Sequence, residues 1–250
     1  MTTLVRAGVG ESRLGEVRAV ETIDLEVTSL RDLNQMLHRL GPRLGPGANE
    51  KHFRVLNPKG RHAIAAGVDA PATIEIDGSG GYYCAGMNKQ ATVIINGSAG
   101  TGVAENMMSG FVHVKGDASQ SAGATGCGGM LVIDGNASAR CGISNRGIDI
   151  VVKGSIGHMS AFMAQAGTLV ALEGAGEALG DSIYEARLYV RGPVKSLGAD
   201  CIEKPMRDAH KAQLKALLDK AGASVDIAEF KRYGSARKLY HFHIDNAGAY

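Results

Sequence analysis

The sequence lacks any run of about 18 apolar residues, so no segment is long and apolar enough to be read as a transmembrane helix. Its first residues, MTTLVRAGVGESRLGEV, also lack the apolar stretch of a secretory signal peptide. At 44% hydrophobic and 21% charged residues, the chain is ordinary for a soluble globular protein, which excludes disorder. We therefore expect a cytoplasmic protein without a membrane partner.

The sequence also lacks an excess of either charge and a cluster of cysteines. The net charge is +2 with both signs interspersed, which gives no reason to expect a nucleic-acid partner. The four cysteines lie far apart and form no CxxC pair, whereas a zinc or iron–sulfur site normally needs closely spaced thiolates. We expect buried, reduced thiols at Cys84, Cys127, Cys141 and Cys201.

No catalytic constellation stands out. The glycine-rich strings at 78–81 and 97–102 are not followed by GK[ST] and open no helix, so they do not predict a phosphate loop. His241 and His243 alternate with apolar residues, which indicates a half-buried strand rather than a metal site. No recognisable nucleophile motif surrounds a Ser, Cys or Thr. We therefore expect no catalytic, cofactor-binding or metal-binding residues in this chain.

Glycine, in contrast, is abundant: the 35 glycines are about twice the usual share. A short apolar segment that ends in a polar residue and glycine recurs seven times, as in TIEIDG, TVIING and FVHVKG. The intervals between successive glycines are 19, 19, 19, 19, 20 and 18 residues, which predicts an internal structural repeat. The repeat glycines are Gly78, Gly97, Gly116, Gly135, Gly154, Gly174 and Gly192.

Two columns of branched aliphatic residues precede these glycines, and alternation with period two places both on one buried strand face. Four residues before each glycine stand Ile74, Val93, Val112, Leu131, Ile150, Val170 and Leu188. Two residues before each glycine stand Ile76, Ile95, Val114, Ile133, Val152, Leu172 and Val190. The glycine is expected to supply the unusual backbone angles with which the chain leaves the strand.

A 19-residue unit has no room for a crossover helix, because a βαβ unit takes about 30 residues and a propeller blade about 40 to 45. The repeat therefore predicts an all-β fold, a single-stranded right-handed parallel β-helix of about seven 19-residue turns with flanking short helices. Charges in the column before the glycine alternate in sign from Lys115 onward, which supports in-register stacking. This column contains Asp77, Asn96, Lys115, Asp134, Lys153, Glu173 and Arg191.

The N-terminal flank, residues 1–51, is expected to contain a short amphipathic helix. Its pattern covers residues 28–40, with Thr28 or Ser29 as the N-cap and Gly41 at the end. The β-helix domain is then expected to span residues 52–201 and to begin with a first strand at 52–56.

The C-terminal flank, residues 202–250, is expected to form a helical cap and tail. A helix can begin at Pro205 and end before Gly222, and we expect a second short helix near 226–233. Such elements would cover the unpaired strand edges at the ends of the solenoid.

The tail combines basic and aromatic residues, a combination enriched in the cores of protein interfaces. Its basic residues are too few for a nucleic-acid surface on a chain of net charge +2. We therefore expect this segment to face a protein partner. The candidate interface residues are Arg232, Tyr233, Arg237, Lys238 and Tyr240.

The glycine-spaced turns of residues 52–201 resemble the GXGXG domain at the C-terminus of the large glutamate synthase subunit, a right-handed parallel β-helix. A chain with little else, ending in FKRYGSARKLYHF and DNAGAY, is similar to the stand-alone β-helix subunit of the methylamine–glutamate N-methyltransferase (N-methylglutamate synthase) family. This resemblance implies a non-catalytic scaffold subunit of an FMN-dependent complex that makes N-methyl-L-glutamate and ammonia from methylamine and L-glutamate.

The resemblance also implies the partners: a glutaminase-like amidotransferase subunit and an FMN-binding glutamate-synthase-like subunit. The family's nucleophile, FMN and iron–sulfur ligands belong to those other chains. Two related alternatives share the fold: a stand-alone glutamate-synthase-like subunit of unknown substrate, and the solenoid subunit of a formylmethanofuran dehydrogenase-type one-carbon complex. A left-handed β-helix acyltransferase is disfavoured, because it needs a six-residue isoleucine period and 18-residue turns.

Overall fold

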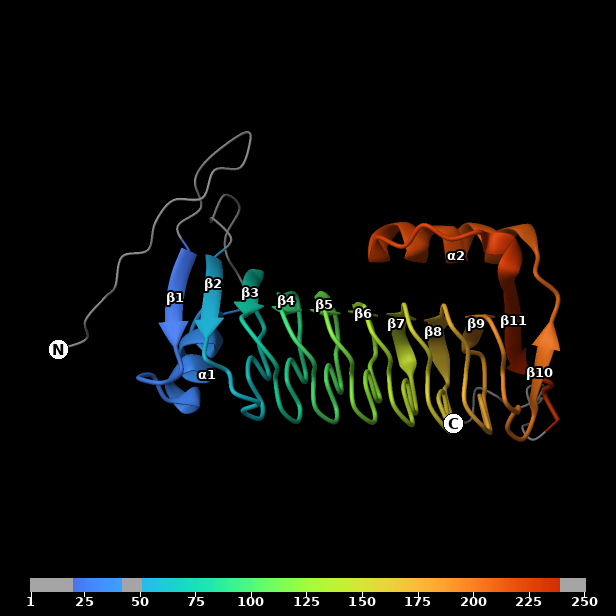
Figure 1. The fold of residues 1–250 in the computed structure, drawn as a ribbon, viewed down its shortest axis with the longest axis horizontal. Helices are drawn as coiled ribbons and strands as arrows, with labels where there is room; N and C mark the ends of the chain where they lie inside the picture. The colour runs from blue at the N-terminus through green and yellow to red at the C-terminus, as the bar shows by residue number, and fades with distance from the viewer. Residues whose placement is uncertain (1–19, 42–50, 239–250) are drawn as a thin grey trace, which may run out of the picture.

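The computed structural model describes residues 20–41 and 51–238. These residues form a long stack of strands with a helix lying along part of it (Figure 1). In chain order the elements are β1 (Val20–Asp24), α1 (Leu30–His38), β2 (Lys51–Leu56), β3 (Ala72–Ile76), β4 (Thr92–Ile95), β5 (Phe111–Val114), β6 (Met130–Ile133), β7 (Arg146–Val152), β8 (Ala166–Ala171), β9 (Arg187–Arg191), β10 (Cys201–Lys204), α2 (Asp208–Ala221), the 3-10 turn η1 (Ile227–Glu229) and β11 (Phe230–Ser235).

The strands of the described residues form one sheet in the order β1-β2-β3-β4-β5-β6-β7-β8-β9-β11-β10. Pairing is parallel from β1 to β9, and β11 then pairs antiparallel with both β9 and β10. A second column of parallel bridges begins at Gly80 and Ala99 and continues to Val194, so successive turns are joined on another side as well. The predicted parallel β-solenoid of about seven turns is confirmed.

The strand register from β3 to β9 is 19 residues, except at the start of β7, where Arg146 pairs with Ala166 before a β-bulge and the 19-residue register resumes at Asp149. Residue 74 pairs with 93, and the series continues through 112, 131, 150 and 169 to 188. Their side chains are buried inside the solenoid together with the column two residues further on. Along the two inward columns, the repeat is therefore more regular than the glycine intervals of 20 and 18 suggest.

The prediction was wrong at one turn. Leu169 and Ala171, not Val170 and Leu172, occupy the two inward columns of β8. Val170 and Leu172 lie on the outer face of the sheet, where other apolar side chains cover them. Gly174 comes one residue late in its turn, and burial on both faces of β8 hides the alternation that would have revealed the shift.

The charged column is confirmed only in its central part. Asp134 forms ion pairs with Lys153 (2.8 Å) and Lys115 (3.8 Å) on the adjacent turns. Although burial of Asp134 opposes ionisation, hydrogen bonds from Lys153 and His113 lower the pKa of this carboxyl group. In the next turn the strict register places Leu172 in this column instead of Glu173, so the sign alternation ends at Lys153.

The repeat glycines are required mainly by close approach between turns. A Cβ atom added to Gly97 would lie 2.7 Å from the backbone of Gly78, and one added to Gly154 would lie 2.8 Å from the carbonyl oxygen of Gly135. Positive φ angles occur at Gly78, Gly174 and Gly192, near the ends of the repeat. The expectation of unusual backbone angles therefore holds only for these three glycines, and the central ones allow the turns to stack at strand spacing.

The side of the solenoid away from the sheet uses left-handed residues at alternate positions. In the first full turn these are Tyr83, Ala85 and Met87, with φ angles of 57°, 53° and 55°. Their backbone amides bond alternately to the next and the previous turn: Tyr83 donates to Thr101 (2.9 Å) and Ala85 to Ile64 (2.9 Å). Each such residue costs on the order of 1 kcal/mol, which the inter-turn hydrogen bonds must offset.

The N-terminal end carries the predicted helix and an additional strand. The Ser29 side chain caps α1 by accepting a hydrogen bond from the Asp32 backbone amide (3.1 Å), and Leu33 and Leu37 are buried. The expected first strand is β2. The sequence pattern did not reveal β1, which pairs in parallel with β2 and extends the sheet by one strand beyond it.

At the C-terminal end, α2 covers the outer face of the later turns (Figure 1). Its buried residues Leu214, Leu217, Leu218 and Ala221 pack on a cluster that includes Val151 and Val170. Gly222, at a left-handed φ of 63°, ends the helix as predicted.

The predicted second helix near 226–233 is wrong. Only one 3-10 turn forms there, and the chain then extends into β11, which lies between β9 and β10. Phe230 packs beneath α2, while Tyr233 joins the interior core. The free edge of β9 offers backbone hydrogen bonds that a short helix cannot replace, so β11 closes the solenoid.

The matched substitutions Val93→Asn and Ile94→Asn test the inward and outward columns on one strand. Val93 is fully buried, so an asparagine there loses apolar burial and places an amide where no hydrogen-bond partner is provided. We therefore expect the free energy of unfolding to fall by about 3 kcal/mol or more. Ile94 is half-buried on the outer face, so its loss should be smaller by at least about 1.5 kcal/mol. Urea unfolding followed by circular dichroism measures both. Equal losses would contradict the assignment of faces.

Candidate interface at the C-terminal cap

The candidate interface residues have different environments. Tyr233 is only 6% exposed and belongs to the core, so its ring stabilises the cap rather than offering surface to a partner. Arg232 is half-buried on β11, and Lys238 is exposed. Tyr240 lies outside the described residues, as do His241 and His243.

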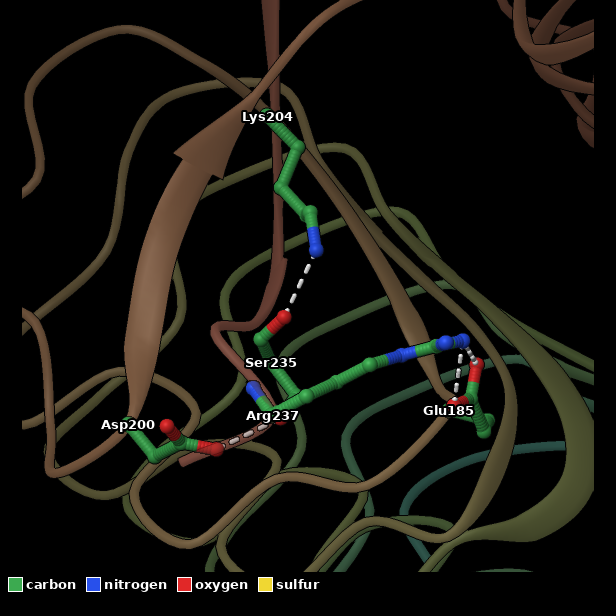
Figure 2. Close-up of polar contacts among 5 residues, drawn as sticks. All are labelled: Glu185, Asp200, Lys204, Ser235 and Arg237. Carbon is green, nitrogen blue, oxygen red and sulfur yellow. Dashed lines mark hydrogen bonds and ion pairs between the residues drawn. The ribbon is translucent and has the colours of Figure 1, made fainter. Parts of the chain in front are cut away.

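A set of polar contacts fixes Ser235 and Arg237 to the end of the solenoid (Figure 2). Arg237 forms an ion pair with Glu185 at 2.7 Å. The Lys204 ammonium group donates to the Ser235 carbonyl oxygen (2.7 Å), and the Ser235 hydroxyl group donates to the Asp200 carboxylate. Arg237 is therefore paired within the chain. Among the charged candidate residues that the structure describes, Arg232 and Lys238 form no intrachain ion pair.

The sequence analysis missed a polar strip beneath α2. Asp149, Thr168 and Arg187 pair in register on the outer face of β7, β8 and β9. From α2, the Gln213 side-chain oxygen accepts hydrogen bonds from Arg187 Nη1 and from the Tyr189 hydroxyl group (3.0 Å each). Gln213 also donates to Thr168 Oγ1 (3.2 Å). The strict 19-residue register would have predicted this column, because the three residues are 19 positions apart.

The described histidines make separate contacts. His113 Nε2 lies 2.9 Å from Asp134, His62 stacks on Tyr82, and His38 contacts the Ala66 carbonyl oxygen at 2.8 Å. Over residues 20–41 and 51–238, no three His, Cys, Asp or Glu side chains are grouped so that they could hold a metal ion.

The cysteines differ in exposure. Cys84, Cys141 and Cys201 are buried as expected, but Cys127 is exposed, so the prediction of buried thiols is wrong at that position. Cys84 and Cys141 share one phase of the repeat, three turns apart. Burial raises the pKa of each of the three buried thiols to about 12, and at Cys201 the nearby carboxylates of Asp200 and Asp181 add to this effect.

Thiol labelling tests this assignment. A thiol with a pKa raised to about 12 stays protonated at pH 8, and only the thiolate reacts. The folded chain should therefore take up one equivalent of an aromatic disulfide reagent rapidly, at Cys127, and four equivalents after denaturation. Cys127→Ser should abolish the rapid phase. Rapid labelling of two or more thiols in the folded protein would contradict the burial of the other three.

Comparison with known proteins identifies a close relative. No protein-family profile matches the chain. None of the helices among residues 20–41 and 51–238 has the length and apolar character needed to cross a membrane. The chain is 62% identical over 229 residues to Protein GlxC of Rhizobium meliloti (strain 1021), a match that covers 91% of this chain and 99% of the relative. Identity at this level over nearly the full length of both proteins shows that the chain belongs to the GlxC family.

Proposed function

We propose that this chain is a non-catalytic scaffold subunit of a glutamate-synthase-like, FMN-dependent complex. The observation that carries the proposal is the strict 19-residue stack of glycine-containing turns from β3 to β9, which resembles the β-helix domain of glutamate synthase. The match to Protein GlxC covers 91% of the chain, so the relative shares most of the solenoid on which the proposal rests.

The shape of the molecule supports a scaffold role. Stacked turns with inter-turn hydrogen bonds on two sides form a rigid body with long lateral faces. On the outer face of the sheet, α2 covers the later strands and Phe111 on β5 packs at the edge of the cluster beneath it, while Ile94 on β4 remains half-buried outside that cluster. A sheet face that is partly apolar and uncovered by α2 is suited to contact another subunit.

At the finer level, we propose a complex of the N-methylglutamate synthase type, which forms N-methyl-L-glutamate and ammonia from methylamine and L-glutamate. Its partners would be a glutaminase-like amidotransferase subunit and an FMN-binding glutamate-synthase-like subunit. In this arrangement FMN and the iron–sulfur ligands belong to the partners, and this chain positions the two catalytic subunits.

The resemblance of the stacked turns to the glutamate synthase β-helix domain also fits a second candidate function. A stand-alone glutamate-synthase-like subunit would use the same fold and the same class of partners with a different substrate. Both candidates keep the scaffold role and differ only in the amine that the complex uses.

Purification of the chain alone and with its partners tests the scaffold role. The isolated chain should show no flavin absorbance band and no turnover. Coexpression with a glutaminase-like and an FMN-synthase-like subunit from neighbouring genes should yield a stable complex that contains flavin. A yellow isolated chain, or failure of all three chains to copurify at low salt, would contradict the proposal.

The substrate can be decided on the same purified complex. Incubation with methylamine and L-glutamate should give N-methyl-L-glutamate and ammonia in equal amounts if the finer proposal is right. A complex that assembles with flavin but leaves methylamine unchanged would exclude the N-methylglutamate synthase assignment and leave the second candidate.

A further inference from the structure

Three arginines from three separate elements converge where α2 begins. Arg187 is the first residue of β9, Arg207 is the N-cap of α2, and Arg232 lies on β11 opposite Tyr189 of β9. The Arg232 Nε atom is 3.4 Å from the carbonyl oxygen of Pro205, two residues before Arg207. The antiparallel pairing of β11 with β9 thus brings all three guanidinium groups to the same end of the sheet.

The three charges are near enough to act on one another. Burial lowers the pKa of His210, in the first turn of α2, and the positive charges of Arg232, Arg187 and Arg207 lower it further. Burial also lowers the pKa of Arg232, and Arg187 and Arg207 act in the same direction, although Tyr189 opposes them. The fold therefore brings three positive charges together at the start of α2, where Arg232 and His210 are partly shielded from water.

No carboxylate of the described residues forms an ion pair with any of these three arginines. Two other arginines of the same cap do have partners: Arg191 pairs with Glu229 (3.1 Å) and Arg237 with Glu185 (2.7 Å). Carboxylates of this chain therefore neutralise Arg191 and Arg237 but leave the three-arginine cluster, Arg187, Arg207 and Arg232, as a concentration of positive charge.

Two nearby acids do not neutralise the cluster. Asp208 is fully exposed and lies 3.6 Å from Lys211. Asp149 is two strands from Arg187 in the same outer column. Burial raises the pKa of Asp149, against the effects of a hydrogen bond with Thr168 and the charges of Lys220 and Arg187. Neither carboxylate is within 4.0 Å of a guanidinium group of the cluster.

The cluster is also held in place. Gln213 fixes Arg187 through a 3.0 Å hydrogen bond and is itself held by Tyr189 and Thr168. At the start of α2 the Arg207 backbone amide donates to His210 Nδ1 (3.1 Å), and the positive end of the helix dipole adds to the field of the arginines. Guanidinium groups present paired N–H donors whose geometry matches the oxygens of a carboxylate or a phosphate.

We propose that Arg187, Arg207 and Arg232 form an oxyanion-binding site at the start of α2, which receives a phosphate or carboxylate group. Arg187 and Arg207 are exposed and Arg232 is half-buried, so the site opens to solvent on one side. The group can therefore belong to a free anion or to an acidic side chain of a partner. The site is defined by this chain alone and does not depend on the proposed function.

Isothermal titration calorimetry of the full chain tests the site at constant ionic strength. Inorganic phosphate and a hexaglutamate peptide are titrated separately into the wild type, Arg187→Gln, Arg232→Gln and the control Arg146→Gln. Arg146 is an exposed arginine at the start of β7 that has no ion-pair partner among the described residues. The wild type and the control should bind at least one probe with the same affinity, and each cluster variant should bind it at least tenfold more weakly.

Binding of phosphate assigns the site to a free anion, and binding of the peptide alone assigns it to acidic side chains of a partner. Thermal melting in chloride buffer checks folding: Arg232→Gln should melt at the same or a higher temperature than wild type, because it removes like-charge repulsion. Absence of binding of both probes to the wild type, or equal binding by wild type and both cluster variants, would overturn the proposal. No partner protein is needed, so failure here leaves the proposed function untouched.

Discussion

The rest of the structure depends on the 19-residue register of the hydrogen bonds between turns. Each strand from β3 to β9 is too short to be stable alone and is held by parallel pairing with the turns before and after it. The register fixes which side chains enter the interior, where glycine is required, and which charges meet. Asp134 meets Lys115 and Lys153 for this reason, and Asp149, Thr168 and Arg187 form the polar strip beneath α2 for the same reason.

Much of the fold could be predicted because aliphatic alternation and a fixed interval are strong signals in sequence. The inward columns followed from these signals except at β8, whereas α1 and α2 followed from helical periodicity and from the residues at the helix ends. Three features did not. The predicted inward position in β8 was wrong by one residue, Val170 instead of Leu169, because both faces of β8 are buried. The alternating left-handed residues such as Ala85 and Met87 carry no turn signature. The strand β11 is formed by pairing with the free edge of β9, a long-range contact that local pattern cannot reveal.

The C-terminal cap shows how much of a functional surface sequence can indicate. Basic and aromatic residues of the tail predicted a contact surface, but only the fold separates Tyr233 in the core and Arg237 in an ion pair from Arg232. Arg187 and Arg207 join Arg232 from positions 45 and 25 residues earlier in the chain. Such a cluster could not be predicted without knowing that β11 lies between β9 and β10. The solenoid thus supplies the rigid frame, and the cap supplies its most distinctive surface chemistry.

Removal of one complete turn tests the central role of the register most directly. Deletion of residues 93–111 joins Thr92 to Val112, leaves every later turn in phase, and removes only the partly buried Phe111 from the cluster beneath α2. This 19-residue deletion should give a soluble chain that unfolds cooperatively within about 10 °C of the parent, because each remaining strand keeps its partners. Deletion of 18 residues, 93–110, should abolish cooperative unfolding, because a one-residue slip reverses the faces of the strand. If the two deletions melt alike, the register does not organise this fold.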